Sequence, residues 1–262
     1  MEAKLAEFEG CFDSEEIKDA DKFEDKAVDF RNWFVECKYN EIQKNFDKLY
    51  TTIMKIAMHY RPKIQMCGCD CIYVLEKEAA PAQIAYKSKE LQKSFDKLVQ
   101  IGHGEVMPAL LPAVTEKIDI VYKNTDEPAF HDFMMHFLET WTREDTAPYH
   151  FTIEFPKIIK HAGMAMSRYI ITALEILTKR AKNAKTAAQF EQYTACVVAL
   201  CEECSPIIIT VKEMIEQFIE VSKELGSKSE KFPKQCEEIQ KILSQAPSLP
   251  TNWTMPVPDI KV

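Results

Sequence analysis

The sequence predicts an all-α fold made of long, kinked, antiparallel helices. Three observations predict it: apolar residues recur at steps of three and four positions, no stretch alternates with a period of two, and only 6 of the 262 residues are glycine. Glycine usually makes up about 7 % of a chain. Its scarcity indicates few tight turns, so we expect helices far longer than the usual three or four turns.

The first long helix is expected to begin near Val35 and to stop at Pro62, because proline cannot continue a helix. Its apolar residues follow the heptad pattern of a coiled-coil seam. They are Val35, Tyr39, Ile42, Phe46, Leu49, Ile53, Ile56 and Tyr60.

A second helix is expected from about Ile84 to Lys123, with kinks at Pro108 and Pro112. Its apolar side consists of Leu91, Phe95, Leu98, Met107, Leu111, Val114 and Ile118. Seven of the nine residues in 41–49 recur at 90–98, and the similarity ends there. We interpret it as a chance match between two amphipathic helices, because a repeat architecture should extend over at least three units.

The third and longest helix is expected over about 155–225, with a kink at Pro206 and an end at Gly226. Its second half has ten consecutive steps of three or four between apolar residues. These residues are Phe190, Tyr193, Val197, Leu200, Cys204, Ile207, Val211, Met214, Phe218, Val221 and Leu225. Shorter helices are expected at about 129–141 and 229–243.

The net charge of −8 is unevenly distributed along the chain. The first 30 residues hold 11 acidic residues and 4 lysines, a local charge of −7. An acidic total argues against a nucleic-acid partner, because affinity for nucleic acid comes largely from neutralising phosphates with Lys and Arg. Phosphate-binding glycine motifs are absent from the sequence as well.

The N-terminus has no basic region followed by an apolar one, and no apolar run approaches the roughly 18 residues of a membrane span. We therefore expect a cytoplasmic chain that associates with membranes only peripherally. The 9 cysteines are expected to be free thiols. A metal site in the clusters Cys67–Cys71 or Cys201–Cys204 is the less favoured alternative, because Cys204 also occupies a core position.

A basic face is predicted within 154–185, where seven cations stand against Glu154 and Glu175. On one continuous helix, Lys157, Lys160, Arg168, Lys179 and Lys182 would fall within an arc of roughly 100°. The opposite side of that helix would be apolar. We expect this face to bind an anionic surface through Lys157, Lys160, Arg168, Lys179, Arg180, Lys182 and Lys185.

Three long helices over about 21–226, the third opening with a basic segment, resemble a BAR domain of the amphiphysin type. The similar stretches are Ile42-Gln-Lys44, Phe95-Asp-Lys-Leu-Val99, Glu154-Phe-Pro-Lys157 and Leu174-Glu-Ile-Leu-Thr-Lys-Arg180. The resemblance implies an antiparallel homodimer with a six-helix core. It also implies contacts between basic residues and anionic phospholipid, for which Lys157, Lys160, Lys179 and Arg180 fit.

Two features depart from that family. The stretch 99–141 has a local charge of −5, although curvature-forming members contribute cations there. The acidic N-terminal stretch is also unsuited to serve as a membrane-inserting amphipathic helix.

The histidines are the candidate residues for catalytic or metal-binding roles. His131 and His136 with Glu139, and His150 with Glu154, do not match the Glu-x-x-His spacing of di-iron bundles. We expect no enzyme, no cofactor and no metal. The C-terminal Ile260-Lys261-Val262 has a form that PDZ-like grooves accept, although such endings are common by chance.

The predicted organisation is an acidic segment over 1–20, a BAR-like helical domain over 21–226, a short helix over 227–243 and a proline-bearing tail over 244–262. The predicted function is a homodimeric module that binds anionic membranes and senses or scaffolds curvature in trafficking or endocytosis. The alternative is a helical bundle with cytoskeletal or adaptor partners. Residues 110–118 and the turn from Trp141 to Tyr149 are faintly similar to the helical N-terminal domain of cyclase-associated, actin-regulating proteins.

Overall fold

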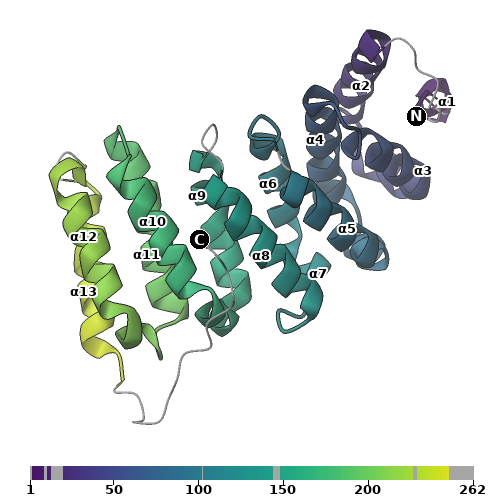
Figure 1. Cartoon of the computed structure of the whole chain (residues 1–262). Helices are drawn as coiled ribbons and strands as arrows, with labels where there is room; N and C mark the ends of the chain where they lie inside the picture. The colour runs from purple at the N-terminus through teal and green to yellow at the C-terminus, as the bar shows by residue number, and fades with distance from the viewer. Residues whose placement is uncertain are drawn as a thin grey trace. The chain divides into compact units, whose positions relative to one another are not determined.

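A computed structural model describes residues 2–8, 11–12, 20–101, 103–143, 148–226 and 229–247 of the chain. Every regular element within these residues is a helix (Figure 1). The predicted all-α class is therefore confirmed. In the described part of the chain, no helix is both long and apolar enough to cross a membrane.

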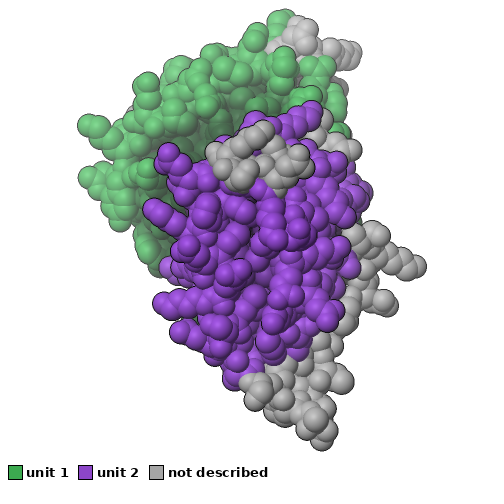
Figure 2. Space-filling view, turned by 90° about the vertical axis from the view of Figure 1, so that its left-hand side faces the viewer, with its two compact units in different colours: residues 1–136, 145–147 green, residues 137–144, 148–262 purple. Residues whose placement is uncertain are grey.

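The chain divides into two compact units, which Figure 2 shows in different colours. Unit 1 comprises residues 1–136 and 145–147, and unit 2 comprises residues 137–144 and 148–262. The boundary falls within α8 (Pro128–Arg143). The domain bounds expected from the sequence stay a prediction.

Unit 1 is built around α4, which packs on α2, α3 and α6, while α5 packs on α6 and α7. Its helices are α1 (Glu2–Phe8), α2 (Ala20–Phe34), α3 (Tyr39–Ala57), α4 (Pro62–Glu78), α5 (Pro81–Ile101), α6 (Met107–Glu116) and α7 (Ile118–Val121). Pro62 occupies the first turn of α4, where a missing N–H costs no helical hydrogen bond. It therefore starts a helix, and the preceding helix already ends at Ala57.

The contact between α3 and α4 depends on Gly68. A Cβ at this position would lie 2.3 Å from the backbone N and Cα of Ala57. Such an approach requires a residue without a side chain. Gly68 thus lets the two helix backbones pack unusually close together.

Unit 2 has two layers of helices. One layer contains α9, α11 and α13, the other contains α10 and α12, and consecutive helices from α10 to α13 also pack on each other. The bounds are α9 (Pro148–Ala162), the 3-10 helix η1 (Gly163–Arg168), α10 (Ile170–Lys182), α11 (Ala187–Glu203), the 3-10 helix η2 (Ile208–Val211), α12 (Lys212–Gly226) and α13 (Phe232–Gln245). Consecutive elements therefore alternate between layers.

The prediction of three long helices was wrong. The longest helix of the described residues, α5, has 21 residues. The expected first helix lacks residues 35–38, the second is divided into α5, α6 and α7, and the third into α9, η1, α10, α11, η2 and α12. The six-helix dimer and its coiled-coil packing stay a prediction.

Local signals explain the breaks in the third stretch. Gly163 has a φ of 52°, in the left-handed region that glycine adopts readily, and it follows the last residue of α9. Thr186 caps α11: its Oγ1 accepts from Gln189 N, and Gln189 Oε1 accepts from Thr186 N. Pro206 lies in the turn between α11 and η2. The expected end at Gly226 is confirmed by the end of α12.

The shorter helices expected at 129–141 and 229–243 correspond to α8 and α13. The predicted tail lies outside the described residues from position 248 onward, and so does the C-terminal Ile260-Lys261-Val262. Residues 13–19 of the predicted acidic segment also lie outside them.

Candidate functional site

The seven predicted lipid-binding residues belong to unit 2, but they do not form a stripe on one helix. Lys157 and Lys160 lie on α9, Arg168 lies on η1, and the other four lie on α10 or just after it. The apolar side was predicted correctly, since Ile158, Ile159, Met166, Ile170, Leu174, Ile176 and Leu177 are all buried. The continuous basic arc was wrong because the helix breaks at Gly163 and again after Arg168.

Arg180 has a structural role in this region. Its Nη2 donates to the backbone O of Trp141 at 2.6 Å and to that of Thr142 at 3.3 Å. These carbonyls belong to the last turn of α8, where they lack helical donors and where a cation also complements the helix dipole. Arg180 therefore caps α8. Lys157 is engaged too, with its Nζ 2.7 Å from Glu154 Oε2.

Four of the predicted cations remain available to a partner. The ammonium groups of Lys160, Lys179, Lys182 and Lys185 are exposed, and no hydrogen bond or ion pair joins them to another described residue. Lys179 and Lys182 are in the last turn of α10, where cations stabilise any helix. Their position therefore has an ordinary structural explanation besides the predicted one.

The described histidines and cysteines are not arranged as a metal site. No group of three His, Cys, Asp or Glu side chains in the described residues could hold a metal ion. His136 pairs with Asp96, Nδ1 to Oδ1 at 2.5 Å, rather than with Glu139. Cys67, Cys69 and Cys71 are buried free thiols of α4, and burial raises the pKa of Cys201 and Cys204 to about 12.

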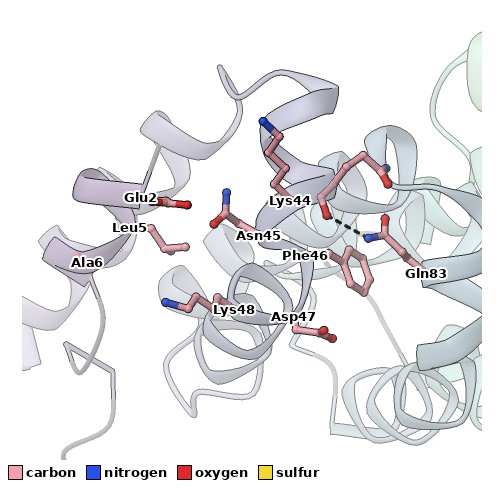
Figure 3. Close-up of a pocket in the computed structure, with 10 residues that line it drawn as sticks. Glu2, Leu5, Ala6, Lys44, Asn45, Phe46, Asp47, Lys48 and Gln83 are labelled. Carbon is pink, nitrogen blue, oxygen red and sulfur yellow. Dashed lines mark hydrogen bonds between the residues drawn. The ribbon is translucent and has the colours of Figure 1, made fainter.

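A hollow of about 510 Å³ lies between α1 and α3 (Figure 3). Asn45 has non-helical backbone angles there and kinks α3. The carbonyls beside the kink are bonded: Glu41 O accepts from Asn45 Nδ2 at 3.0 Å, and Gln43 O accepts from Gln83 Nε2 at 3.2 Å, the dashed line in Figure 3. The side-chain amides of Asn45 and Gln83 thus replace helical N–H donors and stabilise the kink. These residues at the hollow therefore have a structural role.

Two adjoining polar hollows lie along α5, and we name them together the α5 hollow. Its larger part, about 610 Å³, lies between α5 and residues 120–127, and a smaller part of about 350 Å³ lies toward Ala129 and Asp132 of α8. Both parts are lined by Lys89 and Gln92.

The base of the α5 hollow is fixed by hydrogen bonds. Gln92 Nε2 donates to Val121 O at 2.6 Å, and Tyr122 Oη donates to Gln92 O at 3.5 Å. Tyr122 is fully buried and stacks on Phe133 at a centroid distance of 4.9 Å. The hollow is therefore built on a fixed junction between α5 and the end of α7.

Several polar side chains that line the α5 hollow have no partner among the described residues. Ser88, Lys89, Lys93 and Lys123 make no side-chain hydrogen bond or ion pair with another described residue. The three lysines are exposed. Their donors are therefore free to bind a ligand, which makes the α5 hollow the candidate functional site.

The sequence alone does not indicate this site. Lys89 and Lys93 lie four positions apart on the polar side of an amphipathic helix, as in most surface helices. Lys123 is 30 positions further along the chain, so its proximity to α5 follows from the packing of α7 on α5. No motif could have indicated it.

Comparison of the chain with protein-family models, curated proteins and solved structures gives no match. The resemblance to BAR domains is therefore not supported by any relative. The three long helices on which it was based are also not those of the structure.

Proposed function

We propose that the chain is a helical scaffold that binds a protein partner, with an extended segment of the partner lying in the α5 hollow. This is the adaptor function that the sequence left open as its alternative. The observation that carries the proposal is a hollow on a rigid helical base, lined by hydrogen-bond donors without partners in the described residues.

The packing pattern supports the same function. In unit 1, where the α5 hollow lies, α5 packs on α6 and α7 and leaves the side that carries Lys89 and Lys93 exposed; in unit 2, helices alternate between two layers. Stacked helical units of this kind commonly serve as binding surfaces. Polar side chains projecting from one helix can pair with the backbone of an extended peptide without any change in the scaffold.

Site-specific crosslinking tests the proposal. A photoreactive residue at Ser88, inside the hollow, should capture a discrete partner in cells that express the full chain, whereas one at Lys97, two turns beyond Lys89 and outside the lining of the hollow, should not. The captured protein is then purified, and its affinity is measured for the wild-type chain and for Ser88→Trp, which fills the hollow. We expect at least a tenfold loss for Ser88→Trp, and equal affinities would contradict the proposal.

A second candidate function is binding to anionic membrane surfaces through unit 2. It is favoured by one observation, the four exposed lysines without partners on α9, α10 and the following turn. Each cation near an anionic surface contributes about 1 kcal/mol before screening. The proposed contacts are Lys160, Lys179, Lys182 and Lys185.

Cosedimentation with phosphatidylserine vesicles tests this candidate. Binding should weaken with salt and should fall several-fold in Lys182→Glu/Lys185→Glu, but not in Lys234→Glu/Lys241→Glu on α13 of the same unit. Equal losses in both double variants would indicate general charge attraction and contradict a specific face. Arg180 is left unchanged because it caps α8. Analytical ultracentrifugation of the same preparations would test the predicted homodimer, which a concentration-independent monomer would exclude.

A further inference from the structure

The charges around the α5 hollow indicate the chemistry of its ligand. We propose that the α5 hollow binds an extended polypeptide segment rich in Asp and Glu, held by Lys89 and Lys93 on one wall and Lys123 on the other. This inference rests on the proposed function and adds the kind of segment that the partner supplies.

The two α5 lysines form one cationic wall. Four positions on an α-helix correspond to a rotation of about 40° and a rise of about 6 Å, so the side chains of Lys89 and Lys93 leave α5 on the same side. They lie in the middle of α5 (Pro81–Ile101), away from the last turn where a helix dipole would account for cations. Their charge is thus explained neither by an ion pair nor by a helix end.

Two of the three carboxylates that line the hollow, Asp96 and Glu127, have structural explanations. Asp96 is bonded to His136, and Glu127 accepts a hydrogen bond from Asn124 Nδ2 at 3.4 Å. Glu127 directly precedes α8, where an acidic side chain complements the helix dipole, whereas Asp132 lies in the second turn and has no hydrogen bond or ion pair with another described residue. Asp132 lines the smaller part of the hollow and not the larger. In the larger part of the hollow, two lysines, Lys89 and Lys123, therefore stand against one carboxylate, Glu127.

The length of the hollow fits an extended chain. From Ala85 to Asp96, which line its two parts, α5 rises about 16 Å, the length of about five residues in an extended chain. Tyr86 lies about one turn before Lys89 and is 79 % exposed. Tyrosine is enriched at positions that dominate binding energy, so Tyr86 offers an aromatic contact at one end of the segment.

Fluorescence anisotropy with defined peptides tests the inference on the full chain. The probe is a labelled ten-residue peptide of alternating Glu and Ser, and the control probe has Gln in place of every Glu. We expect the Glu peptide to bind at least tenfold more tightly than the Gln peptide, and its affinity to fall with rising salt. Lys89→Glu/Lys93→Glu should weaken the Glu peptide at least tenfold, and Lys123→Glu should weaken it several-fold.

Lys97→Glu is the matched control, because Lys97 is exposed on the same helix but does not line the hollow. Its effect should stay below twofold. Equal binding of the two peptides, or equal losses in Lys97→Glu and Lys89→Glu/Lys93→Glu, would overturn the inference. Circular dichroism establishes folding, and Lys89→Gln/Lys93→Gln replaces the double variant if charge reversal prevents it.

The two proposals fail in different ways. If Ser88→Trp abolishes binding of the crosslinked partner while Lys89→Glu/Lys93→Glu leaves it unchanged, the hollow binds a protein segment but not through acidic residues. If neither variant alters partner binding, the proposed function fails together with the inference.

Discussion

Two buried glutamates, one in each unit, have opposite surroundings. Glu76 on α4 of unit 1 is 1 % exposed, and neither of its carboxylate oxygens has a hydrogen-bond partner in the described residues. Glu154 on α9 of unit 2 is 5 % exposed, but its Oε2 lies 2.7 Å from Lys157 Nζ, one helical turn away. The two are nearly equal in burial and differ in whether the carboxylate forms an ion pair with a described residue.

This difference decides the protonation of Glu76. Burial, and secondarily the charge of Glu116, raise the pKa of Glu76 well above its ordinary value, with Lys117 opposing the shift. A carboxyl group without a partner in a nonpolar interior avoids its charged form. Glu76 therefore favours its neutral form in the folded chain.

The units also differ at their close glycine contacts. A Cβ at Gly68 would overlap the backbone of Ala57, whereas a Cβ at Gly226 on α12 would lie 2.5 Å from Cδ1 of the Phe232 ring. A ring can rotate and a helix backbone cannot move without displacing its neighbours. Unit 1 should therefore tolerate change at its glycine contact less well than unit 2.

The largest expected effect is that of Gly68→Ala. It should lower the free energy of unfolding by about 3 kcal/mol, the upper part of the range for overpacked sites. Gly226→Ala is the control in unit 2 and should cost about 1 kcal/mol or less. Urea unfolding followed by circular dichroism measures both, and similar losses would show that the two contacts are equally yielding.

Glu76→Gln should raise the free energy of unfolding by about 2 kcal/mol at neutral pH, because Glu76 must take up a proton on folding at this pH and Gln need not. Because the folded pKa lies above the unfolded one, the folded chain binds more protons between the two values. The contribution of Glu76 to stability should therefore be fully present below about pH 4 and be lost as pH rises toward the folded pKa, by up to about 1.4 kcal/mol per unit.

Glu154→Gln is the control for this pH dependence. It removes a pair whose lysine is about half exposed, so the loss should stay under about 1 kcal/mol. Urea unfolding at several pH values should show a flatter profile for Glu76→Gln than for the wild type. An unchanged profile would mean that Glu76 is not the titrating group.

The smallest expected effect separates a capping cation from a free one. Arg180→Met should lower the free energy of unfolding by about 1.5 kcal/mol, because the carbonyls of Trp141 and Thr142 lose their charged donor. Lys182→Met, two positions further along α10, should change it by less than about 0.5 kcal/mol. Thermal and urea unfolding of both variants compare them, and equal effects would remove the distinction between the two residues.

Burial could be predicted from the sequence better than helix length. The apolar pattern of the third stretch is buried at Phe190, Tyr193, Val197, Leu200, Cys204, Ile207 and Val211, although the helix breaks after Glu203. The turn and the 3-10 helix after Glu203 preserve the spacing between buried apolar residues up to Val211. Over this stretch, the apolar pattern in the sequence is therefore the same as that of one long helix. At the other end of the chain, Val35, Tyr39 and Tyr60 fit the heptad pattern but are exposed.

The candidate site could not be predicted, for a different reason. Lys89, Lys93 and Lys123 are common surface residues, and what distinguishes them is the absence of a partner within the described structure and the hollow between them. Arg180 shows the converse: its sequence indicated a free cation, and the structure uses it to cap α8. Both facts depend on which segments pack together.

The sequence by itself determined that this chain is helical and which side of most helices is buried, because helix propensity and apolar spacing act within a few turns. The tertiary structure decided where the helices reverse, which charges are paired and where a hollow forms. These properties depend on contacts between residues tens of positions apart, such as Gly68 with Ala57 and Gln92 with Val121, and local spacing contains no record of them.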